Sequence, residues 1–444
     1  LSVLQRLRGL LGVVALLGIA FGLSTDRRRI SLRPVLWGLG LQALFALIVL
    51  NPVVGQFFFE VVDVGVRKLL GFAEVGMSFV FQATTPHEVT YINPEGQKVT
   101  EVFVGQISPV LKSFAFWVLP TVIFFSALIT VLYHLGIMQL VVRGIARAMV
   151  FMLRTSGSET LSCTANIFVG QTEAPLLVKP FVDRMTRSEL MAVMTGGFAT
   201  VAGGVLAIYV AMLQGIPGIA GHLVTASIMA APCALAVAKI MVPETEVSAT
   251  AGQVTLQVQR PDSNVIEAAA RGASEGMTLV LNIAAMLIAF VGLMAMINAL
   301  LGLLGTSVEQ VLGWILSPLA WTMGVPWSDA PTIGQLLGEK LVLTELLAYV
   351  HLSKLVGGPS PLNPRSSVIA SYALCGFANV ASIGIQIGGI GGIAPARRGE
   401  LARLGLRAMA ATNLGASYVF AGRWTEAVRW LREGRDLNLA TGNY

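Results

Sequence analysis

Long apolar runs constrain the fold of this chain more than any other feature. A helix needs about 20 mainly apolar residues to cross the hydrocarbon core of a membrane. Backbone polar groups in lipid must find their partners within the same segment, so each such run is predicted to be an α-helix. Eight full spans are predicted, near residues 8–23, 34–52, 109–135, 189–213, 220–242, 277–304, 367–392 and 401–422.

Composition also places the chain in the cell membrane, as an integral, multi-pass protein. Of the 444 residues, 55% are hydrophobic and only 12% are charged, whereas soluble domains carry about 25% charged residues. The net charge of +6 fits basic cytoplasmic loops. No Lys/Arg-rich arm with interleaved aromatic residues is present, so membrane lipid is an expected partner and nucleic acid is not.

Cysteines and histidines show no pattern typical of a metal or redox site. Cys163, Cys233 and Cys375 lie inside apolar stretches, and the four histidines are scattered without an HExxH pair. This arrangement favours packing roles over disulfides or metal ligands. No organic cofactor is expected.

Less apolar segments complete the organisation. The first span precedes "STDRRRISLR", which indicates a cytoplasmic loop and not a cleaved signal. The charges in "FFFEVVDVGVRKLLGFAEVG" (57–76) are spaced as in an amphipathic helix, which predicts an interfacial helix at about 53–82. A polar linker near 243–264 separates two membrane halves, and the Arg- and Trp-rich end at 423–444 is predicted to be an amphipathic tail.

One motif occurs twice, as "GFATVA" from Gly197 and as "GFANVA" from Gly376, 179 positions apart. Two further apolar regions, at about 150–182 and 311–353, are interrupted by glycine, proline and charge. Each half therefore contains an interrupted region followed by a span that carries the motif.

The interrupted regions also share the dipeptide Thr-Glu, at Thr172-Glu173 and again at Thr344-Glu345, 172 positions later. The repeated order predicts an internal duplication. Duplicated membrane halves with paired broken helices are typical of secondary transporters, whose sites lie at the repeat interface near the middle of the membrane.

Carboxylates at membrane depth indicate function because each costs at least a few kcal/mol. Glu173 and Glu345 are therefore expected to face each other across a polar cavity. An alternative is that they are structural partners of Lys179 and Lys340. Asn379 and Thr200, inside predicted spans, have a similar alternative, as hydrogen-bonding residues between helices.

The stretches "ANIFVGQTEAPLLVKP", "MTGGFATVAGGVLAIYV", "MAAPCALAVAKIMVPE" and "ALCGFANVASIGI" together resemble concentrative nucleoside transporters, over about residues 100–422. The resemblance implies an all-α polytopic membrane protein with eight transmembrane helices, two re-entrant helical hairpins and an interfacial helix. It also implies an inverted-repeat homotrimer, in which a transport domain slides against a scaffold as an elevator.

The resemblance implies a division of the chain into scaffold and transport parts. The scaffold would comprise 1–136 and the span at 276–306, and 243–275 would be the polar linker. The first transport repeat would be 137–242 and the second 307–422, followed by the tail at 423–444.

The resemblance also implies a nucleoside site. Gln171, Thr172 and Glu173 would recognise the nucleobase, and Val205 would supply an apolar contact under it. The ribose hydroxyls would be held by Glu345, Asn379 and Ser382. The chemistry fits, because an amide offers a donor and an acceptor and a carboxylate accepts two hydroxyl donors.

The implied sodium site takes oxygen atoms from four residues. Two would be side chains, of Asn166 and Thr200, and two would be carbonyl groups, of Val169 and Val201. Sodium would be co-transported, as the only cofactor. One departure from the family pattern lies in "LTELLAY", where Thr344 stands for the usual Asn and Leu346 for the usual Phe, so the range of accepted nucleosides stays open.

The predicted function is sodium-coupled nucleoside import by a protein that is not an enzyme. A proton-coupled symporter of the same fold is the alternative, although retention of Asn166 and Thr200 favours sodium. An intramembrane enzyme using the two glutamates as acid and base is less favoured, because no metal cluster, Ser-Lys pair or nucleotide loop accompanies them. A passive channel would not need paired hairpin tips.

Overall fold

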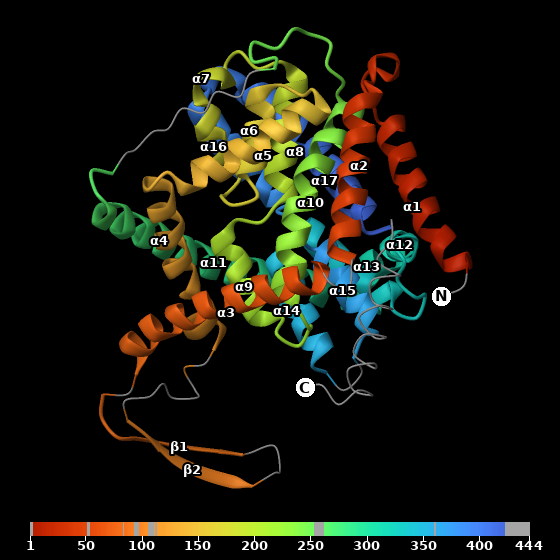
Figure 1. The fold of residues 1–444 in the computed structure, drawn as a ribbon. Coiled ribbons are helices and arrows are strands. Elements are labelled where there is room, and N and C mark those ends of the chain that lie inside the picture. The colour runs from red at the N-terminus through yellow and green to blue at the C-terminus, as the bar shows by residue number, and fades with distance from the viewer. Residues whose placement is uncertain are drawn as a thin grey trace.

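The computed structural model describes residues 3–50, 54–82, 84–92, 97–104, 111, 113–252, 262–358 and 361–421. The predicted tail at 423–444 lies outside these residues. The described chain is predominantly helical, and its one sheet is a short antiparallel hairpin that projects from the helical body (Figure 1).

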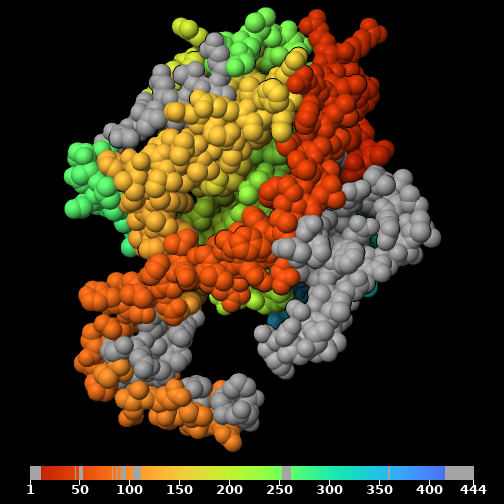
Figure 2. Space-filling model, in the orientation of Figure 1, coloured from red at the N-terminus to blue at the C-terminus, as the bar shows by residue number. Residues whose placement is uncertain are grey.

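The first part of the chain surrounds one side of the molecule. It comprises α1 (Val3–Gly22), η1 (Arg27–Arg29), α2 (Leu32–Leu50), α3 (Val54–Phe81), β1 (His87–Ile92), β2 (Lys98–Phe103), η3 (Phe114–Val118) and α4 (Thr121–His134). α3 packs against α2, α4, α9 and α10. Figure 2 shows α3 crossing this face, with the green surface of the segment around 200–240 visible above it.

The first predicted transport repeat forms a compact group of helices. It comprises α5 (Ile137–Leu153), α6 (Gly157–Ala165), η4 (Ala174–Val178), α7 (Lys179–Val182), α8 (Arg187–Ala199), α9 (Gly203–Met212) and α10 (Ile219–Met241). α6 packs against η4, so residues 166–173 form the tip of a helical hairpin.

The second half begins with the longest helix of the described chain. It comprises α11 (Val265–Gly302), α12 (Val308–Thr322), α13 (Ala330–Val342), α14 (Glu345–Val356), α15 (Pro364–Ala373), α16 (Val380–Ile393), η5 (Pro395–Arg397) and α17 (Arg398–Ala421). α13 and α14 pack together around a turn at Leu343 and Thr344, which makes a second helical hairpin.

Five helical segments of the described residues are long and apolar enough to cross a membrane: Leu32–Val49, Phe114–His134, Arg187–Met212, Ile219–Met241 and Val265–Gly302. They coincide with five of the eight predicted spans. Two shorter apolar helices, Gly12–Gly22 and Val380–Ile393, overlap two more predicted spans. α17 covers residues 401–421 of the predicted span at 401–422 but is not among these apolar segments.

The predicted spans at 189–213 and 367–392 are each interrupted and are not single continuous helices. The first is broken between Ala199 and Gly203, and the second between Ala373 and Val380. Each break falls on a copy of the repeated motif. The motif is therefore the position where a helix stops and another begins.

Burial separates the helices that surround the site from those at the periphery. The window Arg187–Met212 is 89% buried within the molecule and Ile219–Met241 is 83% buried, whereas Val265–Gly302 is only 11% buried. α11 packs mainly on α4 at one edge of the body (Figure 1). The first broken helix and α10 therefore lie in the interior of the molecule, and α11 lies at its periphery.

Candidate functional site

The two motif copies touch where their helices break. Gly376 has φ +101°, and a Cβ atom added to it would lie 2.6 Å from the carbonyl oxygen of Phe198 and 2.8 Å from that of Ala199. A side chain fits neither this backbone conformation nor this space. The glycine of the second copy therefore allows the second break to lie directly on the first.

Asn166, the C-terminal cap of α6, stands beside the first break. Its carbonyl oxygen accepts a 2.6 Å hydrogen bond from Thr200 Oγ1, and its Nδ2 donates to the Ser162 carbonyl at 3.2 Å. Its Oδ1 is buried and has no hydrogen-bond partner among the described residues. A buried polar atom without a partner is costly, and it commonly indicates an ion or water at that position.

Two backbone carbonyls complete this group of oxygens. Val169 lies on the hairpin tip and Val201 lies in the break after Thr200, and both residues are buried. Within the described chain neither carbonyl oxygen accepts a hydrogen bond, although the neighbouring Phe168 carbonyl accepts one from Gly203 N. The four predicted sodium ligands therefore come from two adjoining irregular segments. Three of these oxygen atoms make no hydrogen bond within the described chain, and the fourth, Thr200 Oγ1, acts only as a donor.

Glu345 begins α14 at the tip of the second hairpin and is held on both oxygens. Oε1 accepts a 2.9 Å hydrogen bond from the Tyr209 hydroxyl, and Oε2 accepts a 2.9 Å bond from Asn379 Nδ2. Asn379 caps α16, because its Oδ1 accepts from Ser382 N at 2.8 Å. The structure thus brings the three predicted ribose residues together.

Thr344, the residue that departs from the family pattern, caps α14. Its Oγ1 accepts a 3.3 Å hydrogen bond from Leu347 N. Thr and Asn both serve as N-terminal caps, so the substitution keeps the local function. Leu346 is buried on the same turn and keeps an apolar side chain there.

The predicted nucleobase residues lie on the first hairpin tip. Gln171 is buried, and its Oε1 accepts a 3.0 Å hydrogen bond from Gln386 Nε2 on α16. Thr172 packs against Gly389 of the same helix, where an added Cβ would lie 2.6 Å from Thr172 Cγ2. Val205 is buried in the first turn of α9, next to the break.

The two glutamates of the repeated Thr-Glu dipeptide make separate sets of hydrogen bonds. The Glu173 carboxylate accepts a 3.2 Å bond from Gly170 N in its own turn and shares no hydrogen-bond partner with Glu345 among the described residues. The alternative role of the glutamates, as structural partners of lysines, is not observed. Neither glutamate forms an ion pair with Lys179 or Lys340 in the described chain. The carboxylates have different local partners instead.

Three further residues, which the sequence did not predict as site residues, lie at or next to the site. Tyr209 and Gln386 contact predicted site residues directly. Lys340 is buried, and its Nζ donates to the carbonyls of Ala373 at 2.9 Å and Cys375 at 3.4 Å, where α15 ends. A polar residue within an otherwise apolar run is the only signal that the sequence offers for any of them.

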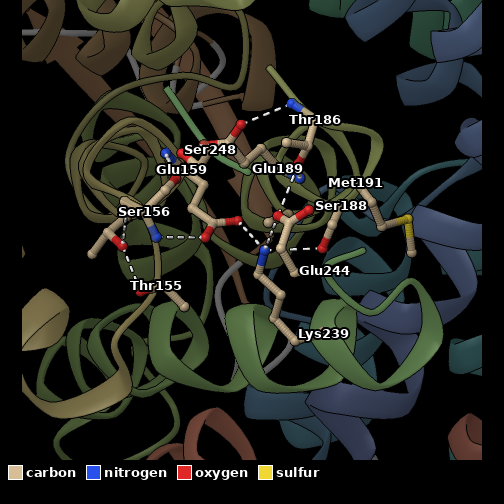
Figure 3. Close-up of polar contacts among 12 residues, drawn as sticks. Thr155, Ser156, Glu159, Thr186, Ser188, Glu189, Met191, Lys239, Glu244 and Ser248 are labelled. Atoms are coloured by element: carbon tan, nitrogen blue, oxygen red, sulfur yellow. Dashed lines mark hydrogen bonds and ion pairs between the residues drawn. The ribbon is translucent and has the colours of Figure 1, made fainter. Parts of the chain in front are cut away.

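A second polar cluster ties the start of the first hairpin to α10 (Figure 3). α6 and α8 each begin with a capping box, Ser156 with Glu159 and Thr186 with Glu189. The Lys239 Nζ lies 2.8 Å from Glu159 Oε2 and 3.3 Å from Glu244 Oε2. The polar linker joins this group, because Ser248 Oγ donates a hydrogen bond to Glu189 and Glu244 accepts one from Thr186. We call the group the Lys239 cluster; it consists of Ser156, Glu159, Thr186, Ser188, Glu189, Lys239, Glu244 and Ser248.

Sequence models of known families match most of the chain. The N-terminal model of the Na+ dependent nucleoside transporters matches residues 11–84 and the C-terminal model matches 222–421. A model described as "Gate: Nucleoside recognition" matches 115–215. Together they cover both halves and both helix breaks.

Relatives and solved structures agree with these models. The chain is 42% identical over 419 residues to an uncharacterized transporter, YutK, of Bacillus subtilis, covering 91% of this chain and 96% of that protein. It is 40% identical over 425 residues to sodium/nucleoside cotransporter 1 of Mus musculus, covering 91% of this chain and 61% of that longer protein. It covers 57% of solute carrier family 28 member 3 of the same species, at 39% identity.

The fold matches a solved transporter in two states. CNTnw in an inward-facing, substrate-bound state superposes with a TM-score of 0.83 at 41% identity, covering 94% of this chain and 98% of that one. A CNTnw variant in an outward-facing state gives a TM-score of 0.84 at 39% identity, covering 96% and 98%. The chain is an integral membrane protein and belongs to the sodium-dependent nucleoside transporter family.

Proposed function

We propose that this protein imports nucleosides across the cell membrane together with sodium. The observation that carries the proposal is the buried, unpartnered Oδ1 of Asn166 beside the free carbonyls of Val169 and Val201. A small hard cation prefers oxygen ligands. Thr200 Oγ1 donates to the Asn166 carbonyl, which leaves its lone pairs for an ion.

The membrane potential supplies the driving force for coupled import. One positive charge that crosses 100 mV contributes about 2.3 kcal/mol. This free energy supports roughly 50-fold accumulation of a neutral solute, before the sodium concentration gradient is added. A transporter that binds sodium next to its substrate can therefore concentrate nucleosides.

The second hairpin supports recognition of ribose. A carboxylate has about four lone-pair positions, and Tyr209 and Asn379 occupy one on each oxygen of Glu345. Each oxygen can therefore accept one further hydrogen bond, from one of two sugar hydroxyls. Gln171, Thr172, Glu173 and Val205 would contact the nucleobase. Phosphorylated nucleotides would meet the like charge of the two glutamates and should be excluded.

We propose that transport uses an elevator mechanism, in which the two broken helices, α8–α9 and α15–α16, move together as one unit. The contact of Gly376 with Phe198 supports this assignment, because the two breaks are packed too closely to move separately. α4 and α11 pack mainly on each other and would belong to the scaffold. The apolar, exposed face of α11 fits lipid or a neighbouring subunit of a homotrimer.

The test is uptake of radiolabelled uridine into proteoliposomes under an inward sodium gradient, with potassium replacing sodium as the control. A third arm imposes a pH gradient without sodium. We expect accumulation only in the sodium arm. Uptake driven by the pH gradient alone would replace sodium coupling with proton coupling, and an absence of saturable uptake of any nucleoside would overturn the proposal.

A further inference from the structure

Gln386 links three separate parts of the site. It lies on α16 and is fully buried, between α8 and the tip of the first hairpin. Its Nε2 donates to the Met194 carbonyl at 3.1 Å and to Gln171 Oε1 at 3.0 Å. Gln171 is one of the residues proposed to contact the nucleobase.

The chemistry of these partners fixes the orientation of both amide groups. A backbone carbonyl only accepts hydrogen bonds, so the Gln386 atom beside Met194 must be the NH2 nitrogen. That nitrogen has two hydrogens, one for Met194 and one for Gln171. The Gln171 atom beside it must therefore be the oxygen.

The Gln171 nitrogen is left facing the other way. It makes no hydrogen bond to any described residue, and it is not among the fully buried, unpartnered atoms. Gln171 therefore presents an N–H donor to whatever occupies the site next to the hairpin tip, while its oxygen is directed to Gln386.

Close packing prevents the two amides from turning over. A Cβ atom added to Gly197 would lie 2.6 Å from Gln386 Nε2 and 3.2 Å from Gln171 Cβ. Rotation of the Gln386 amide would place its oxygen against the Met194 carbonyl oxygen, and two acceptors repel. The orientation is thus set by a backbone atom of α8 and is independent of the substrate.

We propose that Gln386 is a specificity-determining residue that makes the site prefer nucleobases with an exocyclic carbonyl over those with an exocyclic amino group. Uracil and hypoxanthine offer a carbonyl acceptor to the Gln171 donor, whereas cytosine and adenine offer an amino donor. This inference rests on the proposed function, in which Gln171 contacts the nucleobase. A donor that faces a donor leaves two polar groups unpaired, which lowers affinity by about tenfold or more.

The experiment measures how unlabelled nucleosides inhibit uptake of radiolabelled uridine. Uridine is compared with cytidine, and inosine with adenosine, so each pair differs at the exocyclic group. Pyrimidin-2-one riboside, which has no exocyclic group at that position, separates the loss of an acceptor from the presence of a donor. We expect the wild-type protein to bind the carbonyl member of each pair about tenfold more tightly.

Two variants test the role of Gln386. Gln386→Leu releases the Gln171 amide. The ratio of the affinities for the carbonyl and amino members of each pair should then fall close to one. Gln171→Glu keeps the bond from Gln386 and directs an acceptor to the base, so the preference should reverse towards cytidine and adenosine. Gln42→Leu is the matched control, because Gln42 is also buried and donates to a backbone carbonyl, that of Met229 at 3.4 Å, but on α2.

The outcomes separate this inference from the proposed function. A wild-type protein without a carbonyl preference, or a preference that survives Gln386→Leu while Gln171→Glu changes it, would overturn the role of Gln386 and leave nucleoside transport intact. If Gln386→Leu does not fold, an unchanged preference in Gln171→Glu overturns the inference instead. A wild-type protein that transports no nucleoside would refute the proposed function itself.

Discussion

The hydroxyl of Tyr209 donates a 2.9 Å hydrogen bond to Oε1 of Glu345, across 136 positions of sequence. Tyr209 belongs to α9 in the first half and Glu345 begins α14 in the second. The centroids of the Tyr349 and Tyr209 rings lie 4.3 Å apart, so the Tyr349 ring packs against the Tyr209 ring. The carboxylate proposed to hold ribose is therefore oriented by a residue of the other half.

Replacing Tyr209 by Phe should weaken nucleoside binding. A hydrogen bond to a charged group contributes about 1.5–3 kcal/mol, so the KM for uridine should rise by about ten- to a hundredfold. Tyr349→Phe is the control, because the Tyr349 hydroxyl donates to the Ser371 carbonyl and not to Glu345. Equal KM values for Tyr209→Phe and wild type would contradict the orienting role.

Removal of the Asn166 side chain should affect sodium more than nucleoside. Asn166→Ala deletes the unpartnered Oδ1, so the sodium concentration for half-maximal uridine uptake should rise by about tenfold or more. The measurement is uptake against sodium concentration at saturating uridine. Asn298→Ala, which removes an asparagine paired with Glu309 on α12, should leave this curve unchanged. If the curve for Asn166→Ala coincides with that of the wild type, Asn166 is not part of the ion site.

Loss of the Lys239 charge should destabilise the fold. Lys239→Met leaves Glu159 buried without its cation, and breaking a buried ion pair costs about 3–5 kcal/mol. The apparent Tm of the purified protein in detergent should fall by several degrees. Adding Glu159→Gln should recover part of the loss, because the unpaired charge is removed. Lys179→Met, at an exposed lysine of α7, serves as control, and a similar fall there would refute the explanation.

Any side chain at Gly376 should disrupt the contact between the two helix breaks. Gly376→Ala forces a methyl group into a left-handed backbone position, at a cost of about 1–2 kcal/mol, and against the Phe198 carbonyl oxygen. We expect little folded protein by size-exclusion chromatography. Gly384→Ala, on α16 with no atom within 4 Å of the added Cβ, should yield normal amounts. Normal yield and uptake for Gly376→Ala would show that the breaks tolerate separation.

Hydropathy predicted where the helices lie better than where they break. The runs at 34–52, 220–242 and 277–304 correspond to α2, α10 and α11, because apolar length alone determines them. The breaks at 200–202 and 374–379 lie inside predicted apolar spans, so hydropathy did not reveal them. They depend on a contact between the motif copies, and such a contact is not visible in either copy alone.

For the candidate site, too, the sequence predicted residues in recognisable motifs but not residues that reach the site only through the fold. The repeated Thr-Glu and GFAxVA motifs pointed to Glu345 and Asn379, and the structure joins these two residues by a direct hydrogen bond. Gln171 came from the family resemblance alone. The sequence did not identify Tyr209 or Gln386, because single polar residues in apolar runs are common. The sequence also did not reveal the local partners of Glu173 and Glu345, which differ although the Thr-Glu dipeptide is repeated.

The partners that hold the site cross from one half of the chain to the other. Gln171 bonds to Gln386, and Tyr209 bonds to Glu345. A half-length chain would carry each of these groups without its partner. Two separate half-length chains would form such a site only when two molecules met. Covalent fusion turns that encounter into an internal contact whose effective concentration no longer depends on expression level.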